Sequence, residues 1–169
     1  HRLPAITPWL DYLQELGASG LLLGPIFESG THGYDTVDFL RVDRRLGDPD
    51  DFAALVTRAH ERGIRIMLDG VFNHVGRDFP MFQTALQEGP DSAAAQWFRM
   101  TWPHSGDAEP EYDHFEGHRQ LVTLNHANEQ VADFVVEVMC HWLERGADAR
   151  RLDAAYAVPG KFWSRVLPR

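Results

Sequence analysis

The sequence predicts an α/β chain that forms part of a TIM, or (β/α)8, barrel with a small inserted subdomain after the third barrel strand. One pattern occurs three times, at Gly17, Gly63 and Gly146. In each copy a helical pattern ends with an acidic residue, any residue and a glycine, and a strand-like stretch follows. Helices that alternate with strands in this way are typical of parallel sheets. A complete barrel has eight strands in typically ~250 residues, whereas three strands can be counted in these 169 residues. We therefore expect the chain to span part of a barrel.

Composition limits the classes of function. The formal net charge is −9, which disfavours nucleic acid and anionic membranes as partners. The longest nearly unbroken apolar stretch, residues 20–27, is far shorter than the ~20 residues that cross a bilayer. The single cysteine and the lack of a signal-peptide pattern in residues 1–19 favour a cytoplasmic location.

The first repeat predicts a helix that starts near Pro8 and ends at Gly17, followed by a short buried strand over residues 21–23. Glycine suits the helix end because it takes the left-handed conformation at low cost. The apolar residues recur at spacings of three and four, which predicts one buried helical face: Ile6, Trp9, Leu10, Leu13 and Leu16.

The second repeat has the same order. Asp48 is the predicted N-cap of a helix that ends at Gly63, and a buried strand follows over residues 64–68. The core-facing positions of this helix are Phe52, Leu55, Val56 and Ala59.

A long insertion separates the second and third repeats. The glycines of the first two repeats lie 46 residues apart and those of the next two lie 83 apart, so one unit carries about 37 additional residues. We place an inserted subdomain at residues 75–120, between a first barrel part at 1–74 and its continuation at 121–169. Its proline, glycine and polar content predicts irregular structure with one short helix near residues 92–98, packed over the site and outside the main sheet.

The third repeat contains the strongest amphipathic helix pattern of the chain. Its expected core-facing residues are Val131, Phe134, Val135, Val138, Met139, Trp142 and Leu143. Cys140 lies among them and is expected to be a packed thiol. After Gly146, residues 147–152 predict the third strand, and Arg151 and Asp153 then point to the same side of it because they are two apart.

Polar residues gather just beyond each predicted strand, where parallel α/β folds place active sites. They occupy residues 28–35, residues 69–74 and the Arg151/Asp153 pair. Each group taken alone has an ordinary explanation: a turn with a surface tyrosine, an Asp-Gly turn with a capping Asn, or a structural salt bridge. A carboxylate beside a guanidinium also stays ionised at neutral pH and can act as a nucleophile or charge stabiliser.

Taken together and in order, these motifs resemble those of the α-amylase family of glycoside hydrolases, retaining enzymes that act on α-glucosidic bonds. Residues 69–74 match the family motif Asp-X-Val-X-Asn-His, and residues 146–155 match its next motif around Arg-Leu-Asp-Ala-Ala. Residues 25–35 are similar to the segment after the second barrel strand, and residues 121–125 resemble the motif that closes the inserted domain. The resemblance runs from about Trp9 to Pro159.

The resemblance implies a role for each of five residues. Asp153 is the implied nucleophile, and Arg151 is implied to keep its carboxylate ionised and oriented. Tyr34 is the implied aromatic platform under the sugar ring, His74 the partner of a sugar hydroxyl, and Asp69 the residue that pairs with Arg151. An aromatic ring suits the apolar face of a sugar, and negative charge suits an oxocarbenium-like transition state.

The chain also departs from the family pattern. Arg150 stands where an aromatic residue is common, and Tyr156-Ala157 replaces a Lys-His pair found in many calcium-dependent members. Asn73 and Asn125 occupy positions that bind calcium in those members, but Thr123 stands at the usual acidic position, which argues against a calcium site. The acidic side chains of the insert, Asp107 among them, read as a solvated loop rather than as metal ligands. We expect no required cofactor.

The resemblance leaves the chemistry incomplete and several functions open. A retaining glycosidase needs a second carboxyl group as general acid, and the family places that Glu after the fifth strand, which we expect beyond Arg169. The expected partners are an oligosaccharide or α-glucan substrate, and the remainder of the barrel or a second copy at open sheet edges.

Trp97, Phe98 and Trp102 either line sugar subsites or pack the insert.

Hydrolysis and transglycosylation are not separated by these residues. A non-catalytic binding or assembly relative is the first alternative function. A hydrolase with an Asp-Asn-His metal centre near Asp69 and His74 is the second.

Overall fold

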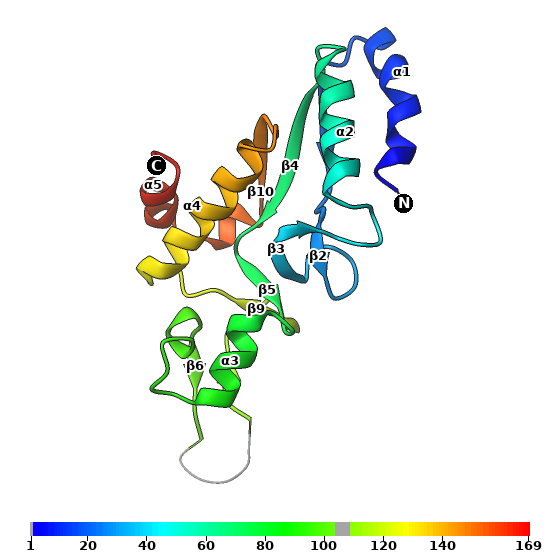
Figure 1. Ribbon diagram of the computed structural model, residues 1–169. Helices are drawn as coiled ribbons and strands as arrows, with labels where there is room; N and C mark the ends of the chain where they lie inside the picture. Colours follow the sequence, from blue (N-terminus) through cyan, green and yellow to red (C-terminus); the bar gives the residue numbers. More distant parts are fainter. Residues whose placement is uncertain (1, 104–108) are drawn as a thin grey trace.

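A three-stranded parallel sheet forms the centre of the computed structural model, which describes residues 2–103 and 109–169. Its strands, in the order β1-β4-β10, are β1 (Gly20–Leu23), β4 (Arg65–Val71) and β10 (Ala149–Asp153) (Figure 1). These are the three strands that the repeat predicts, and they confirm the parallel α/β arrangement. Among the described residues, no strand pairs with the outer edge of β1 or β10, so the sheet does not close into a barrel.

Two long helices pack against one face of this sheet, α2 (Pro49–His60) and α4 (Glu129–Leu143). The predicted N-cap of α2 is confirmed, because the Asp48 side chain accepts a hydrogen bond from the Asp51 backbone N–H at 2.8 Å. The Asp51 side chain accepts from the Asp48 N–H in return, which completes a capping box. A short helix, α5 (Gly160–Val166), packs beside α4 after the turn η3 (Ala155–Ala157).

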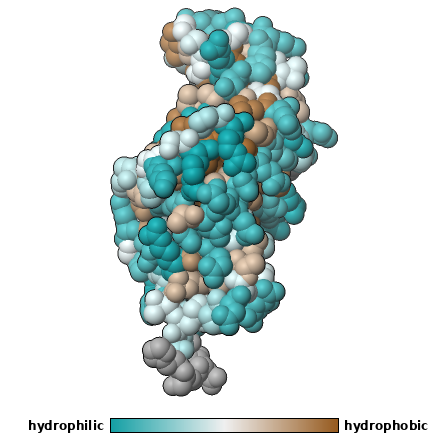
Figure 2. Space-filling view, turned by 90° about the vertical axis from the view of Figure 1, so that its left-hand side faces the viewer, coloured by the Kyte–Doolittle hydropathy of each residue, from teal (hydrophilic) through white to brown (hydrophobic). Residues whose placement is uncertain are grey.

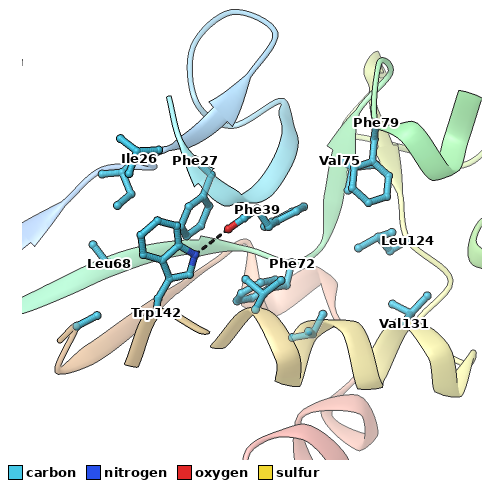
Figure 3. Close-up of a cluster of buried hydrophobic side chains, with 14 of the residues drawn as sticks. Ile26, Phe27, Phe39, Leu68, Phe72, Val75, Phe79, Leu124, Val131 and Trp142 are labelled. Atoms are coloured by element: carbon cyan, nitrogen blue, oxygen red, sulfur yellow. Dashed lines mark hydrogen bonds between the residues drawn. The ribbon is translucent and has the colours of Figure 1, made fainter. Parts of the chain in front are cut away.

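Trp142 of α4 joins the sheet, the helices and a β-hairpin into one core (Figure 3). Its ring centroid lies 5.3 Å from that of Phe27 and 5.2 Å from that of Phe52 on α2. The indole Nε1 donates a hydrogen bond of 2.7 Å to the carbonyl oxygen of Phe39. The buried indole N–H therefore has a partner, and its ring packs where three elements meet.

A hairpin between β1 and α2 carries the first polar segment. Its strands, β2 (Phe27–Ser29) and β3 (Thr36–Val42), are antiparallel and enclose the loop at residues 30–35. The strand β5 (His74–Gly76) passes close to this loop, and a side chain at Gly76 would lie 2.5 Å from the Asp35 carbonyl oxygen. Only glycine allows the two backbones to approach so closely.

The inserted segment forms its own small antiparallel structures, at the bottom of Figure 1. One sheet has the order β5-β9-β8 and a second one pairs β6 with β7, and neither extends the parallel sheet among the described residues. Their bounds are β6 (Met100–Thr101), β7 (Glu111–Tyr112), β8 (His114–Phe115) and β9 (His118–Thr123). Asp107 of the acidic loop lies outside the described residues.

The insert is more regular than the sequence predicts, because it contains the helix α3 (Pro80–Glu88). This helix has no side-chain N-cap and no acidic residue in its first turn, so the usual start signals are missing. The helix expected near residues 92–98 is only a 3₁₀ turn, η2 (Ala95–Trp97). Trp97 and Phe98 are buried in the core, and the Trp97 Nε1 donates to Gln130 Oε1 at 3.0 Å, so both residues pack the insert.

The expected buried face of the first helix is wrong at two positions. The segment starts as a 3₁₀ helix, η1 (Pro4–Trp9), and continues as α1 (Leu10–Glu15). A 3₁₀ helix has three residues per turn instead of 3.6, which shifts the angular position of its side chains. Leu10 is buried as expected, whereas Trp9 and Leu16 are each 62% exposed.

The apolar face of α4 is narrower than expected. Val131, Val135, Val138 and Trp142 are buried, but Leu143 and Cys140 are exposed, so Cys140 is not the packed thiol that the pattern predicts. The face of the molecule in Figure 2 is mostly hydrophilic, with hydrophobic side chains gathered in its upper half. None of the helices in the described part of the chain is both long and apolar enough to cross a membrane.

Candidate active site

Two carboxylates and one guanidinium meet at the carboxyl ends of β4 and β10. Arg151 is the direct register partner of Asp69, and Asp153 lies two residues further along β10. The Nη1 of Arg151 donates a hydrogen bond to Asp69 Oδ2, and its Nη2 donates to Asp153 Oδ1 at 3.0 Å. Asp69 is buried, whereas 16% of the Asp153 side chain is exposed. Arg151 thus fixes both carboxylates and leaves Asp153 accessible.

These side chains lie on the sheet face that the helices leave open. Along β4, Ile66 and Leu68 are fully buried, whereas Met67 between them is 37% exposed. Side chains alternate along a strand, so Asp69 shares the face of Met67, and its register partner Arg151 lies beside it. In a parallel barrel the face opposite the helices is the interior, and its carboxyl end is the active-site end.

Tyr34 and His74 reach the same place from two other elements. The Tyr34 hydroxyl, in the loop between β2 and β3, donates to Asp69 Oδ2 at 3.4 Å. His74 starts β5, and its ring stacks on Phe115 with centroids 4.7 Å apart. The His74 Nδ1 lies 3.1 Å from the Nδ2 of Asn73, and since an amide NH2 only donates, Nδ1 is the acceptor. The neutral ring therefore carries its proton on Nε2.

Two buried polar atoms of this group are left without a hydrogen-bond partner among the described residues. They are the Oδ1 of Asp69, an acceptor, and the Nε2 of His74, a donor. A buried polar atom without a partner is costly, so such atoms in a native structure call for an explanation. A hydroxyl group both donates and accepts, and a ligand rich in hydroxyls would satisfy both atoms.

Burial sets the charge states of the site. It lowers the pKa of His74 to about 4, although the negative charge of Asp153 opposes this change. Burial also raises the pKa of Asp69, while the charge of Arg151 and its hydrogen bond oppose the rise. The negative charge of Asp69 raises the pKa of Arg151. At neutral pH the site therefore combines a neutral imidazole with a permanently charged guanidinium.

The amide nitrogens of the two candidate calcium ligands make contacts within the protein. Asn73 contacts the His74 ring, and the Nδ2 of Asn125 donates to the Gln96 carbonyl oxygen at 2.9 Å. In the described part of the chain, no three His, Cys, Asp or Glu side chains are grouped so that they could hold a metal ion.

Two aromatic residues lie beside the site although the sequence motifs do not assign them to it. Phe115 stacks on His74, and Tyr156 donates from its hydroxyl to Glu116 Oε1 at 2.7 Å. With Asn73, they line a hollow of about 440 Å³. Single aromatic residues in irregular segments have no periodic pattern, so only the folded chain brings them to the site.

Comparisons with known proteins identify the fold family. The family described as alpha amylase, catalytic domain, matches residues 2–166. A cyclomaltodextrinase of Geobacillus thermopakistaniensis is 40% identical over 164 residues, which are 95% of this chain and 28% of that protein. An intracellular maltogenic amylase of Bacillus subtilis is 39% identical over 164 residues, 95% of this chain and 27% of that protein.

A solved structure agrees with the sequence matches. The ligand-free cyclic α-maltosyl-(1→6)-maltose hydrolase of Arthrobacter globiformis superimposes with a TM-score of 0.88 at 36% identity, and the match covers 96% of this chain and 37% of that one. The chain spans less than a third of the length of the two curated relatives. The site at the ends of β4 and β10 agrees with these matches. The family match over residues 2–166 shows that the chain belongs to the α-amylase family and represents part of its (β/α)8 catalytic domain.

Proposed function

We propose that the full-length protein is a glycoside hydrolase or transglycosylase that acts on α-glucosidic bonds of α-glucans or maltooligosaccharides by a retaining double displacement. One observation carries the proposal: Asp153, partly exposed on the open face of the sheet, is ion-paired with Arg151, which also binds the buried Asp69. The names of the relatives, a cyclomaltodextrinase and a maltogenic amylase, support the substrate class.

Asp153 is the proposed nucleophile. Arg151 donates to Asp153 Oδ1, and no described residue hydrogen-bonds Oδ2, which is therefore the oxygen proposed to attack the anomeric carbon. As the new C–O bond forms, the bond to the leaving sugar oxygen breaks and that oxygen takes a proton from a general acid. In the second step water attacks the same carbon, gives a proton to the general acid, which the first step left deprotonated, and releases Asp153 as a carboxylate. A second sugar in place of water gives transglycosylation.

The other residues are proposed to bind the sugar at the cleavage point. Tyr34 presents its ring to the apolar face of the sugar, the neutral His74 donates from Nε2 to a hydroxyl, and Asp69 accepts a hydroxyl at Oδ1. Neither step needs a cofactor. We place the general acid in the part of the enzyme that this chain does not span, and expect the 169-residue chain alone to be inactive. The name of the Bacillus subtilis relative supports a cytoplasmic location.

The Asp153→Asn variant of the full-length protein tests this proposal. The amide keeps the shape of the carboxylate but forms no stable ester with the sugar, so release of reducing sugar from maltotriose or β-cyclodextrin should fall by at least about 10³-fold. Binding of maltotriose, measured by calorimetry, should change little.

The matched control is Asp50→Asn, at an exposed carboxylate in the first turn of α2, which should retain full activity. Near-normal turnover by Asp153→Asn would remove Asp153 from the nucleophile role. Sugar binding without any turnover by the unmodified full-length protein would favour the non-catalytic alternative.

A further inference from the structure

The loop at residues 30–35, which carries Tyr34, is closed by one backbone hydrogen bond, from the Gly30 N–H to the Asp35 carbonyl oxygen at 3.1 Å. The register between β2 and β3 shifts after Phe27 and again after Glu28, so the hairpin lacks a continuous ladder of hydrogen bonds. The Tyr34 hydroxyl makes one long hydrogen bond, to Asp69 at 3.4 Å, and the Tyr34 backbone N–H donates to His32 Nδ1 at 3.2 Å. A hydrogen bond of 3.4 Å is weak, so the position of the Tyr34 ring depends on what holds the loop.

An ion pair between the buried Asp43 and the partly exposed Arg45 adds side-chain support to the loop. Asp43, which is 3% exposed, accepts at Oδ1 from the backbone N–H and the Nε of Arg45, at 2.9 and 2.8 Å. Its Oδ2 accepts from the N–H and the hydroxyl of Ser29. The Arg45 fork continues into the loop: Nη1 donates to the Thr31 carbonyl oxygen at 2.6 Å, and Nη2 to the carbonyl and hydroxyl oxygens of Ser29 at 3.0 and 2.7 Å.

The network reaches both neighbours of Tyr34. On one side, the Ser29 hydroxyl accepts from the Gly33 N–H at 3.0 Å. On the other side, the Thr31 hydroxyl donates to Asp35 Oδ2 at 2.8 Å. Both residues that flank Tyr34 are thus connected, through one intermediate residue each, to the guanidinium of Arg45.

The backbone at Gly33 limits how the loop can relax. Its φ of +97° is in the left-handed region, and a Cβ there would lie 3.2 Å from Pro25. Glycine takes this backbone conformation at low cost, whereas a residue with a side chain would be strained here. Arg45 also holds the pKa of Asp43 well below its usual range, so the pair stays charged across the working range of pH.

We infer that Arg45 is a positioning residue for the proposed reaction: with Asp43 it fixes the 30–35 loop so that Tyr34 presents its ring at the cleavage point. This inference rests on the proposed function. Lysine cannot replace Arg45, because its single ammonium group cannot donate to Asp43, Ser29 and Thr31 in the planar geometry of a guanidinium.

Kinetics of the full-length enzyme on maltotriose test the inference. Arg45→Lys should lower kcat about ten- to a hundredfold through misplacement of Tyr34, while KM changes less than about threefold, since the other sugar contacts remain. In a Tyr34→Ala background the same substitution should have no further effect on kcat, because Arg45 acts through Tyr34. The control is Arg44→Lys, at the exposed neighbouring arginine, with unchanged kinetics. Additive losses in the double variant would overturn the inference.

Amide hydrogen exchange without ligand separates this inference from the proposed function. The N–H groups of Gly33 and His32 donate within the network, so they should exchange at least about tenfold faster in Arg45→Lys than in the unmodified protein. Unchanged exchange would overturn the positioning role whatever the enzyme does. Faster exchange in a protein without glycosidase activity would instead reject the proposed function and keep the loop-fixing role of Arg45.

Discussion

At the scale of single residues, burial decides which groups of the site are charged. His74 is nearly inaccessible, and the cost of placing a charge there lowers its pKa to about 4, even though Asp153 favours the protonated ring. The ring is therefore neutral at pH 7 and can donate from Nε2 without bringing a positive charge toward an oxocarbenium-like centre. A protonated histidine at this position would oppose the transition state that Asp153 is proposed to stabilise.

The lowered pKa of His74 predicts a pH dependence of stability. The unfolded chain binds a proton at His74 below about pH 6.5, whereas the folded chain binds it only below about pH 4. The free energy of unfolding therefore falls as the pH falls from 6.5 to 4, by up to about 3 kcal/mol. Replacement by Gln removes this titration, so the unfolding midpoint in urea should fall less between pH 7 and pH 4.5 in His74→Gln than in the unmodified full-length protein.

His118→Gln, at an exposed histidine of β9, is the matched control and should keep the pH dependence of the unmodified protein. Parallel pH curves for His74→Gln and the unmodified protein would contradict the assignment of a low pKa to His74.

At the scale of elements, strands and helices with a clear period were predictable and contacts between distant segments were not. β4 and β10 follow the expected stretches because apolar runs after a helix-ending glycine have few other interpretations. α3 was missed because Phe79, its N-cap, offers no capping side chain. The shift at Trp9 was missed because helix periodicity does not distinguish a 3₁₀ turn from an α-helical one.

The site likewise contains contacts that the sequence predicts and contacts that it does not. Arg151 and Asp153 were predictable, because a strand period of two places them on one face. The stacking of Phe115 on His74 and the bonds from Arg45 to Ser29 were not predictable, since they join irregular segments that have no shared pattern.

Trp142 is the side chain on which the packing of α4 most depends. Trp142→Ala removes its contacts with Phe27 and Phe52 and leaves the Phe39 carbonyl without its donor, which should lower the free energy of unfolding by about 3–5 kcal/mol. Chemical unfolding of the full-length protein, followed by intrinsic fluorescence and circular dichroism, measures the loss. Trp9→Ala, at a largely exposed tryptophan, should cost less than about 0.5 kcal/mol. Equal losses for the two variants would contradict the described core.

At the scale of the whole molecule, the open face of the sheet has two roles. At its carboxyl end it carries Asp69, Arg151 and Asp153, and further down it carries Leu22 and Met67, which are register partners and are 49% and 37% exposed. Apolar side chains next to unpaired strand edges favour association with other chain segments. The chain spans 28% of the length of its cyclomaltodextrinase relative, so in the full-length protein we expect further barrel strands to cover this face.

The 169-residue chain, expressed alone, should therefore self-associate. Sedimentation velocity between about 5 and 200 μM should show species larger than a monomer, and the double variant Leu22→Ser/Met67→Ser should reduce them. Leu167→Ser, at an exposed leucine just after α5, is the control and should not. Monomers at all concentrations would show that the open face does not mediate self-association.

The most direct test of the account is to trap the covalent intermediate on the full-length enzyme. A fluorinated α-glucosyl fluoride forms the glycosyl-enzyme faster than water releases it, so the ester accumulates and can be located by peptide mass spectrometry. We predict one added sugar per molecule, attached to Asp153 and absent from the Asp153→Asn variant. A sugar attached to Asp69 or to another carboxylate, or turnover of maltotriose without any trapped ester, would contradict the assignment of Asp153 as the nucleophile.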